Sequence, residues 1–365
     1  MADFIPSNVT GHSTMATEFS KTVGIIANPM SGRDGRRLAA RASTVPHESK
    51  RLQITRAVVG AIAAGADHIV VVNEPRRIST GAVENLTLDA HFTYLDVEIT
   101  HNAAETVSAV EQMKALDCKA LIVLGGDGTN RIVAKAWPDA PIVPISTGTN
   151  NVFPLMVEAT LGGMAAGLVA SGRLPLEDAG RPAKVVRVDV DGEPEDIALI
   201  DAVFLINDII GNAMPYESDS IRHIILARAE PASVGISPVG GLLCPSSAED
   251  EFGVEVQCCD HGEAGTHLLA PISPGLFRSL HIRSAERIEL GEPVEITGPG
   301  ILAFDGDRER VLEPGQKAYI RVERNGPHVI DVHKSLQLAA QRGLLTGHMH
   351  WKDNYDGALQ GIGCC

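Results

Sequence analysis

The sequence predicts two domains, an N-terminal doubly wound parallel α/β domain and a mostly antiparallel β-sandwich domain after it. Between Val23 and Thr147, short runs rich in Val and Ile alternate with stretches of helical spacing, which is typical of a parallel sheet covered on both faces. Beyond Lys184, short apolar runs follow one another between turn residues, which is typical of antiparallel sheets. A chain of 365 residues is also long for a single core.

Five strands and several helices are expected in the first domain. The strands are VGIIAN (Val23 to Asn28), HIVVV (His68 to Val72), FTYLDVEI (Phe92 to Ile99), ALIVL (Ala120 to Leu124) and PIVPIS (Pro141 to Ser146). Helices are expected after Arg33, near Arg51, near Thr80, between Ala103 and Leu116, from Asn130, and in the glycine-rich segment from Val157 to Ser171.

The second domain is expected to consist of strands with few helices. Its strand segments read KVVRVDVDGE, IALIDAVFLIND, FGVEVQCCD, THLLAPI, SLHIRS, VEITGPG, ILAFDGD and KAYIRVERN. A short helical stretch, SLQLAAQRGLL, follows from Ser335. We place the domain boundary near Ala179, so that residues 1–20 are a flexible tail, 21–179 the α/β domain, 180–334 the β-rich domain and 335–365 a helical segment with a tail.

Composition and charge exclude several classes of protein. A formal net charge of -15 argues against a nucleic-acid surface or an anionic membrane surface, because both need clustered Lys and Arg. No apolar run approaches the ~20 residues of a membrane-spanning helix, and the first residues lack the basic start and apolar block of a signal peptide. Six cysteines without zinc spacing are too few for a disulfide scaffold. A protein of the reducing cytoplasm, without stable membrane association, is expected.

Three turns that follow predicted strands carry the clearest functional signal. NPMSGRDG follows the first strand, GGDGTN the fourth and STGTNN the fifth. In a doubly wound sheet, ligands bind beyond the carboxyl ends of the strands, so the three turns are expected on one rim. Glycine-rich turns direct backbone N–H groups at one place, and the next helix adds its positive end. Phosphate is the usual ligand of such a turn.

Asp127 stands among the glycines of GGDGT, where a site that only binds anions would not favour a negative charge. A carboxylate at this position can accept a proton or hold Mg²⁺. The alternative is structural, because Asp127 or Thr129 can cap the helix expected from Asn130. The common nucleotide motifs are missing, since the sequence has neither a GxxxxGK[ST] P-loop nor the GxGxxG spacing of dinucleotide-binding turns.

The motifs taken together resemble those of a kinase superfamily. GGDGT (Gly125 to Thr129) resembles the signature shared by NAD kinases, diacylglycerol and sphingosine kinases and, more distantly, phosphofructokinases. NPMSGR (Asn28 to Arg33) and STGTNN (Ser146 to Asn151) resemble the first nucleotide turn and the GTxN turn of the lipid-kinase branch. LIND, GISPVGG, LLAPISPGLFRSL and FDGDRERVLEPGQKAYIRVE resemble, in this order, segments of the NAD kinase β domain. The resemblance extends over Val23 to Val332, and is strongest to the ATP-NAD kinase-like proteins of acetoin catabolism.

The resemblance implies transfer of the γ-phosphoryl of ATP, accompanied by Mg²⁺, to a hydroxyl group, with nucleotide in the first domain and substrate in the second. On this reading the phosphates are bound by residues of the three turns, namely Asn28, Ser31, Gly125, Gly126, Gly128, Thr129, Gly148, Thr149 and Asn150. Asp127 is the first candidate for orienting or deprotonating the acceptor. Asp307 is the second, because lipid kinases place a functional acid just after the Asp-Gly pair; here it is an aspartate rather than the usual glutamate.

Four further residues are candidates for substrate binding by resemblance, namely Asn207, Asp208, Ser237 and Asp305. Asn207 and Asp208 match the Asn-Glu pair that contacts the dinucleotide in NAD kinases, although Asp reaches less far than Glu. The alternatives are that these two cap a strand end and that Asp305 belongs to an Asp-Gly β-turn. The histidines show no convincing ligand or triad spacing, and no metal ligand set is assigned.

The acceptor is the least determined part of the resemblance. NAD or a related metabolite is expected first, but the tyrosine-containing segment that follows the proline-glycine loop in NAD kinases is absent from GISPVGGLLCPSS. One alternative is a lipid kinase, which NPMSGR and STGTNN favour and which the lack of a basic or amphipathic stretch opposes. Another is a nucleotide-binding regulatory protein without turnover. A homo-oligomer is expected by resemblance only.

Overall fold

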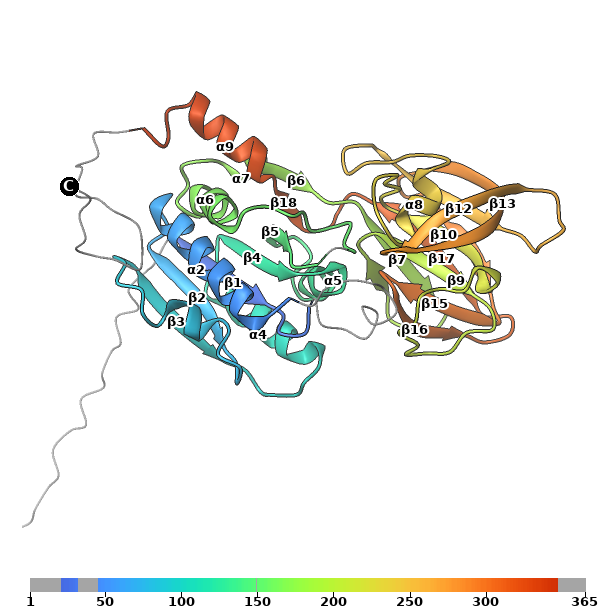
Figure 1. Cartoon of the computed structure of the whole chain (residues 1–365), viewed down its shortest axis with the longest axis horizontal. Helices are drawn as coiled ribbons and strands as arrows, with labels where there is room; N and C mark the ends of the chain where they lie inside the picture. Colours follow the sequence, from blue (N-terminus) through green and yellow to red (C-terminus); the bar gives the residue numbers. More distant parts are fainter. Residues whose placement is uncertain (1–20, 32–44, 149, 347–365) are drawn as a thin grey trace, which may run out of the picture.

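The computed structural model describes residues 21–31, 45–148 and 150–346. The helix expected after Arg33 and the phosphate-binding candidate Thr149 lie outside these residues. Figure 1 shows a sheet covered by helices in one half of the molecule and two helix-poor sheets in the other. The predicted combination of a parallel α/β domain and a mostly antiparallel β domain is therefore confirmed.

The first sheet has seven strands in the order β3, β2, β1, β4, β5, β18, β6. Its strands are β1 (Thr22–Ala27), β2 (His68–Asn73), β3 (His91–Asp96), β4 (Ala120–Gly125), β5 (Pro141–Ser146), β6 (Gly180–Pro182) and β18 (His328–Ile330). The first five are parallel, as predicted, and β3 ends three residues earlier than expected. β18 adds parallel to β5 and β6 antiparallel to β18.

Helices cover both faces of this sheet, because its strands are apolar on both sides. Within the described residues the helices are α2 (His47–Ala63), α3 (Thr80–Val83), α4 (Ala103–Ala115), α5 (Asp127–Ala136), α6 (Ala159–Ala170), α7 (Leu176–Ala179), α8 (Ser237–Gly241) and α9 (Val332–Gln341), with a 3-10 turn η1 (Ser218–Ser220). α2 and α6 bury one face of the sheet and α4 and α5 the other. In the part that the model describes, no helix is long and apolar enough to cross a membrane.

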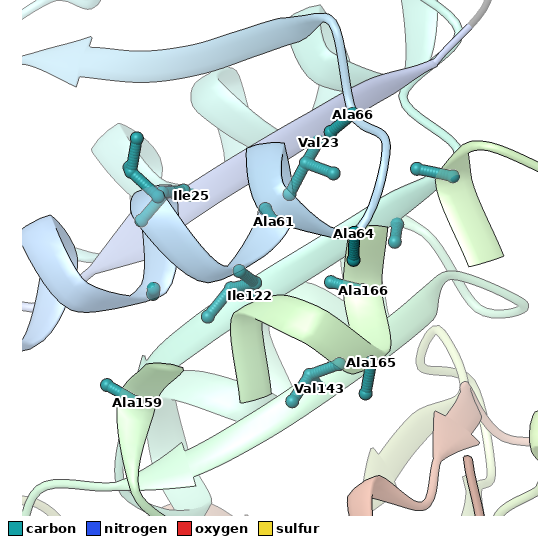
Figure 2. Packing of buried hydrophobic residues seen from close by; sticks show 14 of the residues in the cluster. Val23, Ile25, Ala61, Ala64, Ala66, Ile122, Val143, Ala159, Ala165 and Ala166 are labelled. Atoms are coloured by element: carbon teal, nitrogen blue, oxygen red, sulfur yellow. The ribbon is translucent and has the colours of Figure 1, made fainter. Parts of the chain in front are cut away.

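Figure 2 shows the core between α2, α6 and the sheet, which is built from Ala, Val and Ile. The small residues let the two helices approach each other closely. A Cβ atom on Gly163 of α6 would lie 2.0 Å from the carbonyl oxygen of Ala57 of α2. The glycine-rich sequence ATLGGMAAGLVA is thus explained by the contact between two helix backbones.

Two antiparallel sheets form the β domain. One has the order β12, β13, β11, β10, β9, β15, β16 and the other the order β14, β17, β7, β8. Their strands are β7 (Val185–Val190), β8 (Asp196–Ala198), β9 (Asp201–Leu205), β10 (Ile221–Leu226), β11 (Phe252–Cys258), β12 (Thr266–Ser273), β13 (Leu276–Glu289), β14 (Val294–Thr297), β15 (Gly300–Phe304), β16 (Asp307–Leu312) and β17 (Lys317–Glu323). The sheets pack face to face around a core of Val, Ile, Leu and Phe, which makes this domain a sandwich.

The division of the chain into sheets differs from the expected domain ranges at two places. β6 and β18 lie within the range 180–334 that we assigned to the β-rich domain, yet both pair in the first sheet. The chain returns to the first sheet because β5 would otherwise be an open edge, and β18 pairs with it. The backbone N–H of His328 donates to the carbonyl of Ala140 (2.8 Å). α9, expected from Ser335, begins at Val332 and packs against α6.

Candidate active site

The three glycine-containing turns meet at one end of the first sheet, because β1, β4 and β5 are neighbours in register. A cavity of about 630 Å³ lies between these turns and the β domain. Most of the residues that the sequence singled out line it, namely Asn28, Ser31, Gly126, Asp127, Gly128, Thr129, Gly148, Asn150, Ser237, Asp305 and Asp307. Gly125 ends β4 and is not part of the lining.

Side chains of the first turn tie the three turns together. The side-chain amide of Asn28 donates from Nδ2 to the Thr129 hydroxyl (2.9 Å). Its Oδ1 accepts the backbone N–H groups of Met30 (2.8 Å) and Ser31 (3.3 Å). The Ser31 and Thr147 hydroxyls are 2.7 Å apart and hydrogen-bonded. Asn28 and Ser31, expected to contact phosphate, therefore have a positioning task as well.

A buried lysine that the sequence analysis missed supports the first turn from below. The Lys50 side chain of α2 is fully buried, and its Nζ donates to the carbonyl oxygens of Asn28 (2.8 Å), Pro29 (2.9 Å) and Ser31 (2.6 Å). Because the lysine satisfies three carbonyls at once, the turn is held in one conformation. No local sequence signal marks this residue, since its partners lie about twenty positions earlier in the chain.

The last three residues of the GGDGT motif form the beginning of α5 rather than a loop before it. α5 begins at Asp127, three residues earlier than predicted, with Gly126 as N-cap and no capping side chain. A Cβ atom on Gly126 would lie 2.8 Å from the amide oxygen of Asn151, so the glycine allows the turn after β4 to contact the turn after β5. The capping alternative for Asp127 and Thr129 is therefore not what the structure shows.

The Asp127 carboxylate is held by the loop that follows β5. It accepts the backbone N–H of Phe153 (2.8 Å) and that of Val152 (3.2 Å). Burial raises the pKa of Asp127 to about 7, and the charge of Asp305 adds to the increase, while the two N–H groups and the Arg228 guanidinium oppose it. A carboxyl group with such a pKa can both take up and release a proton near neutral pH.

Arg228 is a second residue that sequence reasoning missed. It follows β10, its guanidinium lies 4.9 Å from the ring centre of Phe153, and its Nη1 donates to the carbonyl oxygen of Val152 (3.4 Å). Arg228 of the β domain thus contacts Val152 and Phe153, the residues whose N–H groups bind the Asp127 carboxylate. Burial lowers the pKa of Arg228. Its partners lie about seventy-five residues away in sequence, which explains why no local motif revealed it.

The FDGD segment forms the tight turn between β15 and β16. Asp305 (φ 49°) and Gly306 (φ 94°) both have positive φ, as a two-residue hairpin turn requires. The Asp305 carboxylate accepts the backbone N–H groups of Leu199 (2.8 Å), Ile200 (2.8 Å) and Asp201 (3.2 Å). Asp305 therefore belongs to an Asp-Gly β-turn, which was the alternative interpretation of FDGD. The residue lines the cavity, but its carboxylate is hydrogen-bonded to backbone N–H groups of the protein.

Asp307 comes directly after this turn and faces the GGDGT motif. A Cβ atom on Gly128 would lie 3.6 Å from its Oδ2, so the Asp307 carboxylate stands beside the first turn of α5. The two acids that the sequence analysis put first, Asp127 and Asp307, therefore lie on opposite domains and border the same cavity.

Asp201 is a further acid at the cavity and was not predicted as a site residue. It begins β9, is 6% exposed, and its Oδ1 has no hydrogen-bond partner among the described residues. Burial raises its pKa well above the ordinary value, and the charges of Asp305 and Asp127 act in the same direction. This shift favours the protonated, uncharged form of Asp201. Its one visible signal was its position, a single acid inside the apolar run IALIDAVFLI.

Comparison with known proteins identifies the family. Residues 23–173 match the ATP-NAD kinase N-terminal domain, and residues 184–325 match the acetoin catabolism protein X C-terminal domain. Acetoin catabolism protein X of Cupriavidus necator is 32% identical over 349 residues, which cover 92% of this chain and 97% of that protein. The chain belongs to the acetoin catabolism protein X family. The resemblance to ATP-NAD kinase-like proteins is confirmed.

The chain is also similar, at lower sequence identity, to solved structures. Yeast NADH kinase complexed with NADH aligns with a TM-score of 0.49 and 14% identity over 90% of this chain and 89% of that chain. An NAD kinase from Archaeoglobus fulgidus in complex with ATP aligns with a TM-score of 0.41 and 13% identity over 77% of this chain and 99% of that chain.

Two of the predicted substrate-binding residues, Asp208 and Ser237, have hydrogen-bond or ion-pair partners within the protein. Asn207 has a positive φ (54°) after β9, and neither it nor Asp208 lines the cavity. The Asp208 carboxylate binds the guanidinium of Arg308 (3.1 Å) instead. The Ser237 hydroxyl donates to the carbonyl of Arg228 (2.7 Å) and accepts the N–H of Glu230 (2.8 Å), so it orders the loop that carries Arg228.

Proposed function

We propose that this protein is an ATP-dependent phosphotransferase that moves the γ-phosphoryl of ATP to a hydroxyl of a small acceptor. The observation that carries the proposal is the Asp127 carboxyl group, which borders a cavity of about 630 Å³ at the start of α5 and has a pKa of about 7. The match to the ATP-NAD kinase N-terminal domain supports the nucleotide assignment.

The chemistry follows from the positions of the groups. The N-terminal end of α5 offers backbone N–H groups and a positive dipole to the ATP phosphates. Asp127 would accept the proton of the acceptor hydroxyl while that oxygen bonds to the γ-phosphorus and the bond between the γ-phosphorus and the bridging oxygen breaks. ADP leaves with the electron pair, and the proton remains on Asp127 until solvent removes it. The reaction needs positioning and neutralisation of charge more than covalent chemistry from the protein.

The cavity also suits the Mg²⁺ that accompanies ATP. Mg²⁺ takes oxygen ligands and is usually held by one or two carboxylates together with phosphates and water. Asp307, beside Gly128, would supply such an oxygen, and bound Mg²⁺ would neutralise phosphate charge. Among the described residues no group of three or more His, Cys, Asp or Glu is arranged to hold a metal by itself, which agrees with an ion that arrives on the nucleotide.

NAD or a related metabolite is the first acceptor to test. Two observations favour a different soluble acceptor, because the tyrosine-containing segment of NAD kinases is absent and Asp208 is bound to Arg308. A lipid kinase is the second candidate, but a net charge of -15 opposes adsorption to an anionic bilayer. A non-catalytic nucleotide-binding regulator is the third. We also propose a cytoplasmic location and, by resemblance, a homo-oligomer; the described cysteines are all free thiols.

One experiment separates these functions. Purified protein is incubated with ATP and Mg²⁺ and, in turn, with NAD, NADH, acetoin, diacylglycerol and a panel of sugars, polyols and hydroxy acids, while ADP is measured. We expect turnover with a soluble acceptor, and kcat/KM that increases with pH around an apparent pKa near 7. Asp127→Asn should lower the rate by about 100-fold or more. Binding of ATP without any ADP would identify a regulator, and absence of ATP binding would reject the proposal.

A further inference from the structure

The wall of the cavity that faces the phosphate turns comes from the β domain and contains a group of apolar side chains beside the acids Asp201, Asp305, Asp307 and Glu309. Met214, Pro215, Ile236 and Ile272 contribute to it. Arg308 of β16 lies among these residues, although only 4% of its surface is exposed. A buried guanidinium costs free energy unless its N–H groups find acceptors, so its partners show what the wall is built to bind.

The protein provides acceptors for two of the three guanidinium nitrogens of Arg308. Its Nε donates to the Asp208 carboxylate (3.1 Å) and its Nη1 to the carbonyl oxygen of Met214 (2.9 Å). The plane of the group lies against the Tyr216 ring, 4.1 Å from its centre. Nη2 is buried and has no acceptor among the residues that the structure describes. The guanidinium is thus fixed on three sides, with donors left for an oxygen that the protein does not supply.

The other cationic side chains in the described lining are neutralised by acids. Arg131 binds Asp196 (3.0 Å) and Glu309 (2.6 Å), and Lys135 binds Asp196 (2.8 Å). Arg308 is also paired with an acid, Asp208, but its Nη2 keeps N–H donors without an acceptor, and guanidinium N–H groups bind carboxylate and phosphate oxygens.

We propose that the acceptor is a small alcohol that carries an anionic oxygen group, a carboxylate or a phosphate ester, which Arg308 binds. This inference rests on the proposed phosphotransfer and names the class of acceptor. The carbon skeleton would lie against the apolar side chains of this wall, with the anionic group at Arg308 and the hydroxyl towards Asp127. Asp208 is a positioning residue, because it holds Arg308 from behind and does not line the cavity. Burial raises the pKa of Asp201, which favours the uncharged form of this acid beside such an anion.

The test compares three molecules with the same three-carbon skeleton. Glycerate carries a carboxylate, glycerol 3-phosphate a phosphate ester, and glycerol neither. Calorimetry measures their binding to the full-length protein, with and without a non-hydrolysable ATP analogue. We expect at least one of the two anions to bind and glycerol to bind about tenfold or more weakly. The anion that binds identifies which of the two groups Arg308 takes.

Variants at position 308 and at a matched control position complete the test. Arg308→Gln should weaken binding of the anion by about 10- to 100-fold and leave nucleotide affinity unchanged. Arg310→Gln is the control, because Arg310 is on the same strand but does not line the cavity. Its partners are Glu193, Asp196 and the carbonyl of Pro194. If Arg308→Gln does not fold, Arg308→Lys keeps the charge without the fork and should still weaken binding by about threefold or more, compared with Arg310→Lys.

The outcomes separate this inference from the proposed function. Equal binding of glycerol and both anions, or no effect of Arg308→Gln and Arg308→Lys, would overturn the inference even if ATP turnover is found with a neutral acceptor. Failure of both anions to bind would overturn it as well. Binding that depends on Arg308 in a protein that never forms ADP would support the anion site and reject the phosphotransfer.

Discussion

Substitution of Asp127 by Asn should stabilise the folded protein at neutral and alkaline pH while it removes activity. The side chain is partly buried, and its pKa rises from the ordinary value of 3.8 to about 7. Between these two pH values the unfolded chain releases the proton while the folded chain keeps it, so the stability of the wild type falls as pH increases. Above pH 7 the folded protein bears the full cost of a carboxylate in this environment.

The size of the effect follows from the pKa. A change from 3.8 to about 7 corresponds to ~4 kcal/mol, at about 1.4 kcal/mol for each pKa unit. Solvent that reaches the partly buried carboxylate reduces this free-energy cost. We therefore expect the free energy of unfolding of Asp127→Asn to exceed that of the wild type by about 2–3 kcal/mol above pH 7. Asn keeps the shape and an oxygen that can accept the N–H groups of Val152 and Phe153.

Urea unfolding at a series of pH values measures this difference. The curves of wild type and Asp127→Asn should coincide near pH 4, separate between pH 4 and 7, and run parallel above. Asp117→Asn removes the same charge from an exposed side chain and should show no such pH dependence. A difference between Asp127→Asn and wild type that is constant with pH, or a variant that is less stable at pH 8, would refute the reasoning.

Three further predictions concern groups that the fold buries. Lys50→Met leaves three carbonyl oxygens without their donor and should lower the free energy of unfolding by about 2–4 kcal/mol in urea titrations, whereas exposed Lys119→Met should change it by less than about 0.5 kcal/mol. Gly163→Ala places a methyl group 2.0 Å from the carbonyl of Ala57 and should cost about 1–3 kcal/mol, visible as a lower Tm. Burial raises the pKa of Cys118 to about 12, so mass spectrometry should find it alkylated by iodoacetamide at pH 8 only after unfolding.

Strands with strong local signals were predictable, and strands defined by their neighbours were not. β4 reads ALIVLG, is buried throughout and stands between two other parallel strands, so composition alone identified it. β16 reads DRERVL, with four charged residues in six, and its residue pattern alone predicted no strand there. It is a strand because the turn at Asp305 and Gly306 returns the chain along β15 at the sheet edge. β10, IRHIIL, was missed for a similar reason. Its apolar and polar residues do not alternate, although the strand lies inside the sheet.

The site divides in the same way. The turns that hold Asp127 and Asp307 were predictable, because glycines beside an acid are a local feature of the sequence. Lys50, Arg228 and Arg308 were not, because each is defined by partners distant in the chain, such as the carbonyl of Val152 for Arg228 and the Asp208 carboxylate for Arg308. The start of α5 was misplaced since the chain has no capping side chain at Gly126.

The electrostatics of the cavity bear on the choice between catalysis and simple binding. Burial raises the pKa values of Asp127, Asp201 and Asp305, and the charge of Asp305 adds to the increase at Asp127 and Asp201. These shifts lower the stability of the fold as pH increases through the range in which the three acids ionise. A site that only bound nucleotide would bind its phosphates more tightly without a carboxylate at the helix N-terminus, because that carboxylate repels them. Local rules of stability are usually broken where a group performs chemistry. The cost of keeping Asp127 at the start of α5 therefore favours a proton-transfer role, and so turnover, over a regulator that only senses nucleotide.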